Sequence, residues 1–136
     1  MEYVQMREGP GATREPITRN SSGIPLAKTA SYSVLESDLF AGVSNFSNAG
    51  AGGAVTFSLP ILTAKYNGMR VSFRRDAAQN VVIDAPAGTL LKDAAAASSD
   101  GGTLTASTTT EKAFIELEYY HPDWFSRTKI GTWAAA

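Results

Sequence analysis

Apolar and polar residues alternate over much of the chain from residue 31 onward. In 54–59 the apolar residues Val55, Phe57 and Leu59 fall on one side of an extended chain, hydroxyl side chains fall on the other, and Pro60 follows. This alternation is typical of a β-strand with one buried face. Further strands are predicted over 31–36, 69–74, 80–84, 103–110 and 112–120, with shorter apolar segments over 89–92 and 125–133.

Only two short segments have a sequence that is compatible with a helix. Residues 61–66 can form a single turn after a proline, and residues 93–99 contain four consecutive alanines. A segment of about seven residues does not form a stable helix alone. Turn residues separate the predicted strands, as in the dipeptide Asn67-Gly68. We therefore predict an all-β domain over residues 31–136, with an antiparallel β-sandwich or a jelly-roll-like barrel as its architecture.

Residues 1–30 follow neither a helical nor a strand period. They contain three prolines and three glycines, and five charged residues lie between Glu2 and Glu15. Because proline lacks an N–H and restricts the residue before it, the segment is predicted to be an extended N-terminal arm. It is either a disordered tail or an arm that is ordered only against a partner. Apolar residues that could anchor such an arm are Tyr3, Val4, Met6, Ile17, Ile24 and Leu26.

The composition excludes several classes of chemistry. With no cysteine, the chain cannot form disulfides, iron–sulfur clusters or cysteine-based zinc sites, and its single histidine rules out a multi-histidine metal site within one chain. Twelve basic and 13 acidic residues create no overall field that would attract nucleic acid or an anionic membrane. The uncharged stretch 41–64 contains asparagines, serines and a proline, so it is not a membrane span. The first residues lack the pattern of a secretory signal, so we expect synthesis in the cytoplasm.

Small residues dominate the composition. Alanine (21), glycine (12), serine (13) and threonine (13) make up 59 of the 136 residues, and charged residues are only 18%. An average soluble domain has about 25% charged residues. The low charge indicates a surface that neighbouring molecules cover, and it argues against most enzymes. We expect neither a cofactor nor a small-molecule substrate.

Two acidic residues and the histidine are the main candidates for chemistry. Glu116 and Glu118 lie two apart on one predicted strand and share a face, which suits a solvated surface or an ion pair between subunits better than catalysis. His121 stands at a strand end between a tyrosine and a proline, and no Ser-His-Asp order with an elbow motif is present. A structural or interface role is therefore predicted for His121.

Basic and aromatic residues supply candidates for partner binding. Arg70 and Arg74 point the same way from one predicted strand, so they form either a solvated face or a docking surface for an acidic partner; nucleic acid would require more such contacts. Five of the 13 aromatic residues lie in the last 18 positions. They either fill the core or anchor an interface between subunits, with Tyr120, Trp124 and Phe125 as the predicted contacts.

The stretch from residue 32 to residue 133 resembles a small β domain that recurs in virion proteins of tailed double-stranded DNA phages. The resemblance is one of pattern and covers about 100 residues. It rests on Tyr32-Ser-Val34 with Ser37-Asp38, Gly53-Ala-Val-Thr-Phe-Ser-Leu-Pro60, Gly68 before 70–73, 80–85 with Ala87-Gly88, and Gly131-Thr-Trp133.

Domains that look like this occur both in head-associated and in tail-fibre-associated proteins. Fibre proteins of this kind are commonly much longer, whereas a compact domain with an arm looks more like a capsid decoration (cement) protein, a class that is commonly trimeric. The resemblance therefore implies a non-enzymatic structural protein on the outer surface of the phage head. Its expected partners are the major capsid protein and further copies of itself, in a homotrimer. The alternative is a tail-fibre or baseplate attachment module involved in host adsorption.

Overall fold

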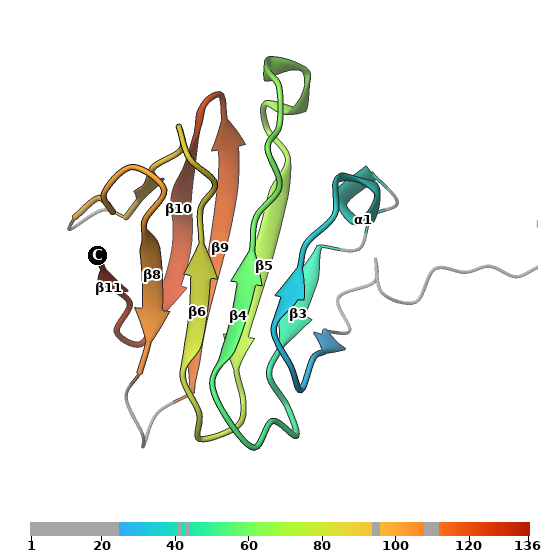
Figure 1. Cartoon of the computed structure of the whole chain (residues 1–136), viewed down its shortest axis with the longest axis vertical. Helices are drawn as coiled ribbons and strands as arrows, with labels where there is room; N and C mark the ends of the chain where they lie inside the picture. Colours follow the sequence, from blue (N-terminus) through green and yellow to red (C-terminus); the bar gives the residue numbers. More distant parts are fainter. Residues whose placement is uncertain (1–24, 41, 43, 94–95, 108–111) are drawn as a thin grey trace, which may run out of the picture.

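The computed structural model of the chain describes residues 25–40, 42, 44–93, 96–107 and 112–136. These residues are mostly in β-strands, which form two mixed sheets that face each other (Figure 1). One sheet has six strands in the order β1 (Leu26–Ala27), β3 (Asn45–Ser47), β5 (Arg70–Arg75), β9 (Ala113–Tyr120), β10 (Asp123–Ile130) and β7 (Leu91–Lys92). The other has five, in the order β11 (Ala134–Ala135), β8 (Thr103–Ala106), β6 (Val81–Asp84), β4 (Val55–Ser58) and β2 (Tyr32–Ser33).

From β1 to β6 the chain passes from one sheet to the other with every strand. Each consecutive pair of strands, one in each sheet, therefore makes one winding, and successive windings stack through parallel pairs within each sheet. A parallel pair requires a crossover connection, and here the strand of the opposite sheet serves as that crossover. The two strands of the first winding, β1 and β2, lie at the edges of their sheets.

The predicted β class is confirmed, but the predicted antiparallel pairing is only partly right. Five of the nine pairs of neighbouring strands run parallel, and four run antiparallel. The alternation of apolar residues in a sequence is the same for both kinds of pair, so it does not distinguish them. The pairing follows from the route of the chain between the sheets.

Phenylalanines from both sheets form the centre of the core. Phe46 and Phe73 lie opposite each other on β3 and β5, and Phe57 on β4 packs against them from the other sheet. The ring centroid of Phe57 is 5.6 Å from that of Phe46 and 5.1 Å from that of Phe73. All three side chains are fully buried. Tyr32 continues the cluster toward the first winding, with its ring centroid 5.7 Å from that of Phe46.

The strongest sequence patterns correspond to observed strands. In β4 the residues Val55 and Phe57 point into the core, and in β9 buried and less buried side chains alternate as expected. The predicted turn over 61–66 is confirmed by a short 3-10 helix, η2 (Ala64–Tyr66). Gly68 follows with a φ of +91°, a conformation that favours glycine. In the described part of 93–99, Ala97 forms an isolated bridge to β7 instead of a helical turn.

A short helix, α1 (Glu36–Phe40), was not expected from the sequence. Asp38 holds it in place, because its Oδ2 accepts hydrogen bonds from the hydroxyl of Tyr32 (2.6 Å) and the backbone N–H of Leu35 (2.9 Å). The hydrogen bond to Asp38, together with burial and the nearby negative charge, raises the pKa of Tyr32 to about 12. No helix among the described residues is long and apolar enough to cross a membrane.

Candidate partner-binding surfaces

Most of the apolar residues of the predicted arm lie outside the described residues. These are Tyr3, Val4, Met6, Ile17 and Ile24. Leu26 is different, since it belongs to β1, lies opposite Phe46 and packs against the core. The β domain therefore begins earlier than the predicted boundary at residue 31, and Leu26 is part of its six-stranded sheet.

The predicted aromatic contacts separate into two groups. Trp124 is 0% exposed, and its ring centroid lies 5.0 Å from that of Tyr119 in the core. It is a core residue, so the prediction that it contacts a partner is corrected. Tyr120 and Phe125 are exposed on the outer face of the six-stranded sheet and contact each other edge to face, with centroids 6.4 Å apart. Neighbouring positions on a strand point to opposite sides of the sheet, which accounts for the difference between Trp124 and Phe125.

The outer face of the six-stranded sheet carries paired charges. Arg70 Nε lies 3.6 Å from Glu118 Oε1, and Arg127 Nη1 lies 2.6 Å from the same oxygen. Arg127 Nε is also 3.8 Å from Glu116 Oε1. The two glutamates thus share a face as predicted, but their partners are arginines of the same chain from β5 and β10. These contacts favour a solvated, internally paired face over catalysis by Glu116 and Glu118.

His121 is held by hydrogen bonds at the turn between β9 and β10. The Tyr119 hydroxyl donates to the carbonyl of Leu62 at 2.9 Å, so its oxygen is left to accept from His121 Nδ1 at 2.8 Å. The His121 backbone N–H donates to Asn67 Oδ1 at 2.7 Å. Burial, with a smaller effect of the negative charge of Asp123, raises the pKa of Tyr119. These contacts support the structural interpretation of the histidine. Among the described residues, no group of three or more histidine, aspartate or glutamate side chains could hold a metal ion.

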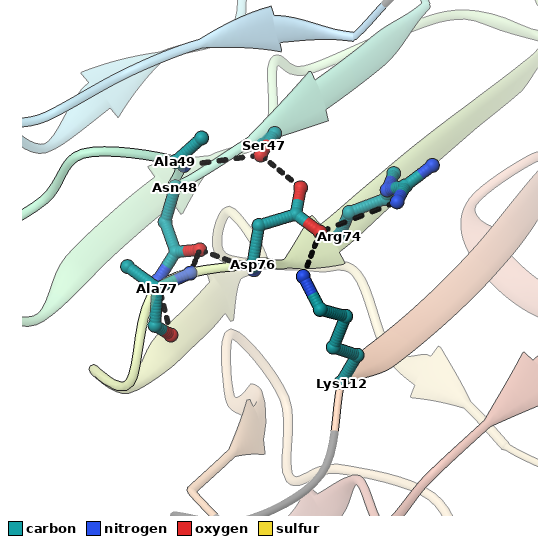
Figure 2. Close-up of polar contacts among 7 residues, drawn as sticks. All are labelled: Ser47, Asn48, Ala49, Arg74, Asp76, Ala77 and Lys112. Carbon is teal, nitrogen blue, oxygen red and sulfur yellow. Dashed lines mark hydrogen bonds and ion pairs between the residues drawn. The ribbon is translucent and has the colours of Figure 1, made fainter.

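A polar cluster joins two loops at the lower end of the molecule in Figure 1, where β3 and β5 end. Asn48 is fully buried there. Its Oδ1 accepts from the backbone N–H groups of Asp76 (2.7 Å) and Ala77 (3.0 Å), and its Nδ2 donates to the carbonyls of Ala77 (3.4 Å) and Gln79 (3.3 Å). Figure 2 shows that the Asn48 side chain lies against the segment that follows β5. One side chain therefore fixes the loop after β3 to the loop after β5.

Asp76 extends this cluster toward two cations. Its Oδ2 accepts from Ser47 Oγ at 2.5 Å, and its Oδ1 lies 3.2 Å from Arg74 Nη2 and 3.7 Å from Lys112 Nζ (Figure 2). Arg74 thus projects from the predicted face of β5, but its partner is Asp76 and not the Glu118 that pairs with Arg70. Burial acts to raise the pKa of Asp76, but the hydrogen bonds from Ser47 and Arg74 and the charges of Arg74 and Lys112 outweigh it, so the pKa is lowered.

The lowered pKa of Asp76 predicts a loss of stability in acid. Since the folded pKa lies below the usual 3.8, the carboxylate stabilises the fold above that pH, and this contribution is lost as the pH falls through the folded pKa. We expect Asp76→Asn to lower the free energy of unfolding by about 1–2 kcal/mol at pH 7. Urea unfolding of both proteins from pH 7 to pH 2 measures the difference between them, which should shrink below about pH 4. A difference that stays constant over this range would contradict the assignment.

Among the residues that the structure describes, six large apolar side chains are exposed. Phe40 and Ile61 are the most exposed, at 82% and 77%. Phe40 also borders a hollow of about 460 Å³, together with Glu36, Ser37, Lys65 and Tyr66. The other exposed side chains are Leu35, Tyr120, Phe125 and Ile130. Ile130 borders a second hollow of about 270 Å³, which we call the Arg74 hollow. The other residues that line it are Arg74, Asp76, Lys112, Ala113 and Phe114.

No protein-family model matches the chain, and no curated protein matches it either.

Proposed function

We propose that the chain is a structural protein of a phage virion, a decoration (cement) protein that binds the outer surface of the head and stabilises it. Its partners in this proposal are the major capsid protein and two further copies of itself. It acts without a cofactor and without catalysis. The proposal includes a sandwich arrangement for the two sheets and synthesis in the cytoplasm of the host.

The observation that carries this proposal is the set of exposed apolar side chains. Single exposed leucines are common on soluble proteins, but phenylalanine and isoleucine side chains exposed by more than three quarters are less so. Phe40 is the last residue of α1, and Ile61 belongs to the loop after β4; both elements lie in the upper half of Figure 1. Burying such side chains against a partner is worth about 1.5–3 kcal/mol each. The low charge of the chain is consistent with a surface covered in an assembly.

Stabilisation of the head follows from mass action. A protein that binds the assembled shell and not its free subunits shifts the equilibrium against disassembly. A trimer gains further affinity because its second and third contacts form at a high effective concentration. In this proposal the exposed apolar side chains and the anchors in residues 1–24 supply the contacts.

Co-sedimentation with phage heads of the matching major capsid protein tests the proposal. We expect saturable binding, and we expect the double variant Phe40→Ser, Ile61→Ser to bind at least about tenfold more weakly. Thr105→Ser on β8 is the matched control and should bind like the unchanged chain. A second variant, with residues 2–24 deleted and β1 retained, tests the arm; undiminished binding would contradict its role.

The position of the protein in virions separates decoration from the alternative. Gold labelling should mark many sites over the head. Labelling of a few sites at the tail would overturn the proposal in favour of a fibre or baseplate attachment module.

A further inference from the structure

One row of paired residues on three strands lines the Arg74 hollow, and two of them, on β9 and β10, form an apolar floor. Arg74 on β5 lies opposite Phe114 on β9, which in turn lies opposite Ile130 on β10. Residues paired in this way project to the same side of a sheet. Ile130 is 61% exposed and Phe114 is partly exposed, so a side chain that enters the hollow meets apolar surface next to a guanidinium group.

The polar wall of the hollow has an excess of positive charge. Arg74 and Lys112 both approach one oxygen of Asp76, while the other oxygen of Asp76 is occupied by the hydroxyl of Ser47. These described residues carry two positive charges and one negative charge. The Lys112 side chain is 75% exposed, so its remaining N–H donors can reach a ligand. A guanidinium has five N–H donors, and the contact with Asp76 engages one nitrogen of Arg74.

Asp76 keeps the two cations together. The backbone of Asp76 is fixed by Asn48, and its carboxylate is fixed by Ser47, so the point that Arg74 and Lys112 approach does not move freely. A site whose charged groups are already positioned loses less conformational entropy when a ligand binds. Phe114 is the second residue of β9 and Ile130 is the last residue of β10, and the two are paired with each other, so the floor belongs to the sheet.

We propose that the Arg74 hollow binds an acidic segment of the partner protein. A carboxylate of that segment accepts hydrogen bonds from Arg74 and Lys112, and a neighbouring apolar side chain packs on Phe114 and Ile130. The pairing of Arg74 with Phe114, and of Phe114 with Ile130, places a cation beside an apolar surface. The segment that fits this surface is therefore a peptide in which acidic and apolar residues alternate. The inference rests on the proposed function only for the identity of the partner as a capsid protein.

A synthetic peptide tests the site on the isolated, isotope-labelled protein. The probe is a capped heptapeptide of alternating aspartate and leucine, and its reference is the same peptide with asparagine in place of aspartate. Two-dimensional NMR of the full chain at millimolar peptide should show saturable shifts at Lys112, Phe114 and Ile130 with the first peptide. The asparagine peptide should bind at least about fivefold more weakly, as expected when a charge-assisted hydrogen bond is lost.

Matched variants show whether the peptide binds at the Arg74 hollow. Lys112→Gln and Ile130→Ser should each weaken binding by about threefold or more, since each removes one of the two kinds of contact. Arg70→Gln, on the same strand as Arg74 but paired with Glu118, should leave binding unchanged. Because Lys112 and Ile130 are exposed, these variants are expected to fold, and urea unfolding verifies that they do.

Three results would overturn the inference. The first is the absence of saturable binding. The second is equal weakening by Arg70→Gln and Lys112→Gln, which would indicate long-range attraction without a site. The third is competition by inorganic phosphate at the same concentration as the peptide, which would indicate a general anion site without a role for the apolar floor.

The head-binding assay separates this inference from the proposed function. If the unchanged chain binds heads and Lys112→Gln binds them equally well, the inference fails and the proposed function stands. If the peptide binds in the hollow but the chain binds no heads, the proposed function fails and the chemistry of the site stands.

Discussion

Replacing Phe57 by alanine is expected to lower the free energy of unfolding by about 3–5 kcal/mol, the usual cost of removing a fully buried aromatic ring. Phe57 is the contribution of the five-stranded sheet to the central phenylalanine cluster, with ring centroids 5.6 Å from Phe46 and 5.1 Å from Phe73. Truncation leaves a cavity between two sheets, and rigid strands on both sides cannot close it. The loss is a large part of the stability of a domain of this size.

Urea unfolding followed by tryptophan fluorescence measures the effect. The buried Trp124 and Trp133 report on the core. Phe40→Ala is the matched control, because it removes the same ring from an exposed position and should change the free energy of unfolding by less than about 0.5 kcal/mol. A loss below about 1 kcal/mol for Phe57→Ala would contradict close packing of the two sheets at this point.

Replacing Asn48 by alanine is expected to cost about 2–4 kcal/mol, although it removes few atoms. The Asn48 side chain satisfies the backbone N–H groups of Asp76 and Ala77 and the carbonyls of Ala77 and Gln79. Without it, the two N–H groups lose their partner in a partly buried region, whereas the two carbonyls still accept from the Gln79 N–H and from Arg75 Nε. Leaving a buried polar group unsatisfied costs about 1–3 kcal/mol, and water that enters the vacated space offsets part of that sum.

Two comparisons make the prediction for Asn48 specific. Asn67→Ala, which removes a single hydrogen bond from an exposed asparagine, should cost no more than about 1 kcal/mol. Asn48→Asp keeps the acceptor oxygen but loses the donor and places a second carboxylate near Asp76, so it should be destabilising at pH 7 and less so in acid. If Asn48→Ala lowers the free energy of unfolding no more than Asn67→Ala does, the hydrogen bonds of Asn48 between the two loops do not stabilise the fold.

The strands were predictable where one face is continuously buried. The alternation in 54–59 and 112–120 reflects direct packing of every second residue in the core, and this signal does not depend on the neighbouring strand. The shorter elements gave no such signal. β1 and β3 have two and three residues, too few to display a period. Their position is determined by pairing with distant strands, and a local pattern carries no information about that pairing.

The sequence identified which residue types serve as contacts, but not on which side of the sheet each residue lies. Trp124 and Phe125 are both large aromatic residues, and such residues serve equally in cores and interfaces. Only the strand register places one in the core and the other outside. Asn48 was missed for a similar reason, since asparagine after a strand is typical of an exposed turn. Its burial becomes evident only when the loop after β5 is placed beside it.

The winding of the chain has a consequence for how the domain opens. A stack of windings is held by contacts between nearest neighbours, so its end unit can separate at a lower cost than an inner one. Among the described strands, β1 and β2 of the first winding have a paired neighbour on one side only, whereas β3 and β4 are paired on both sides. The N-terminal end of the domain is therefore the part that can detach locally while the phenylalanine cluster stays closed. When it does so, β3 and β4 become the edges, and their exposed backbone groups can pair with a strand from another molecule.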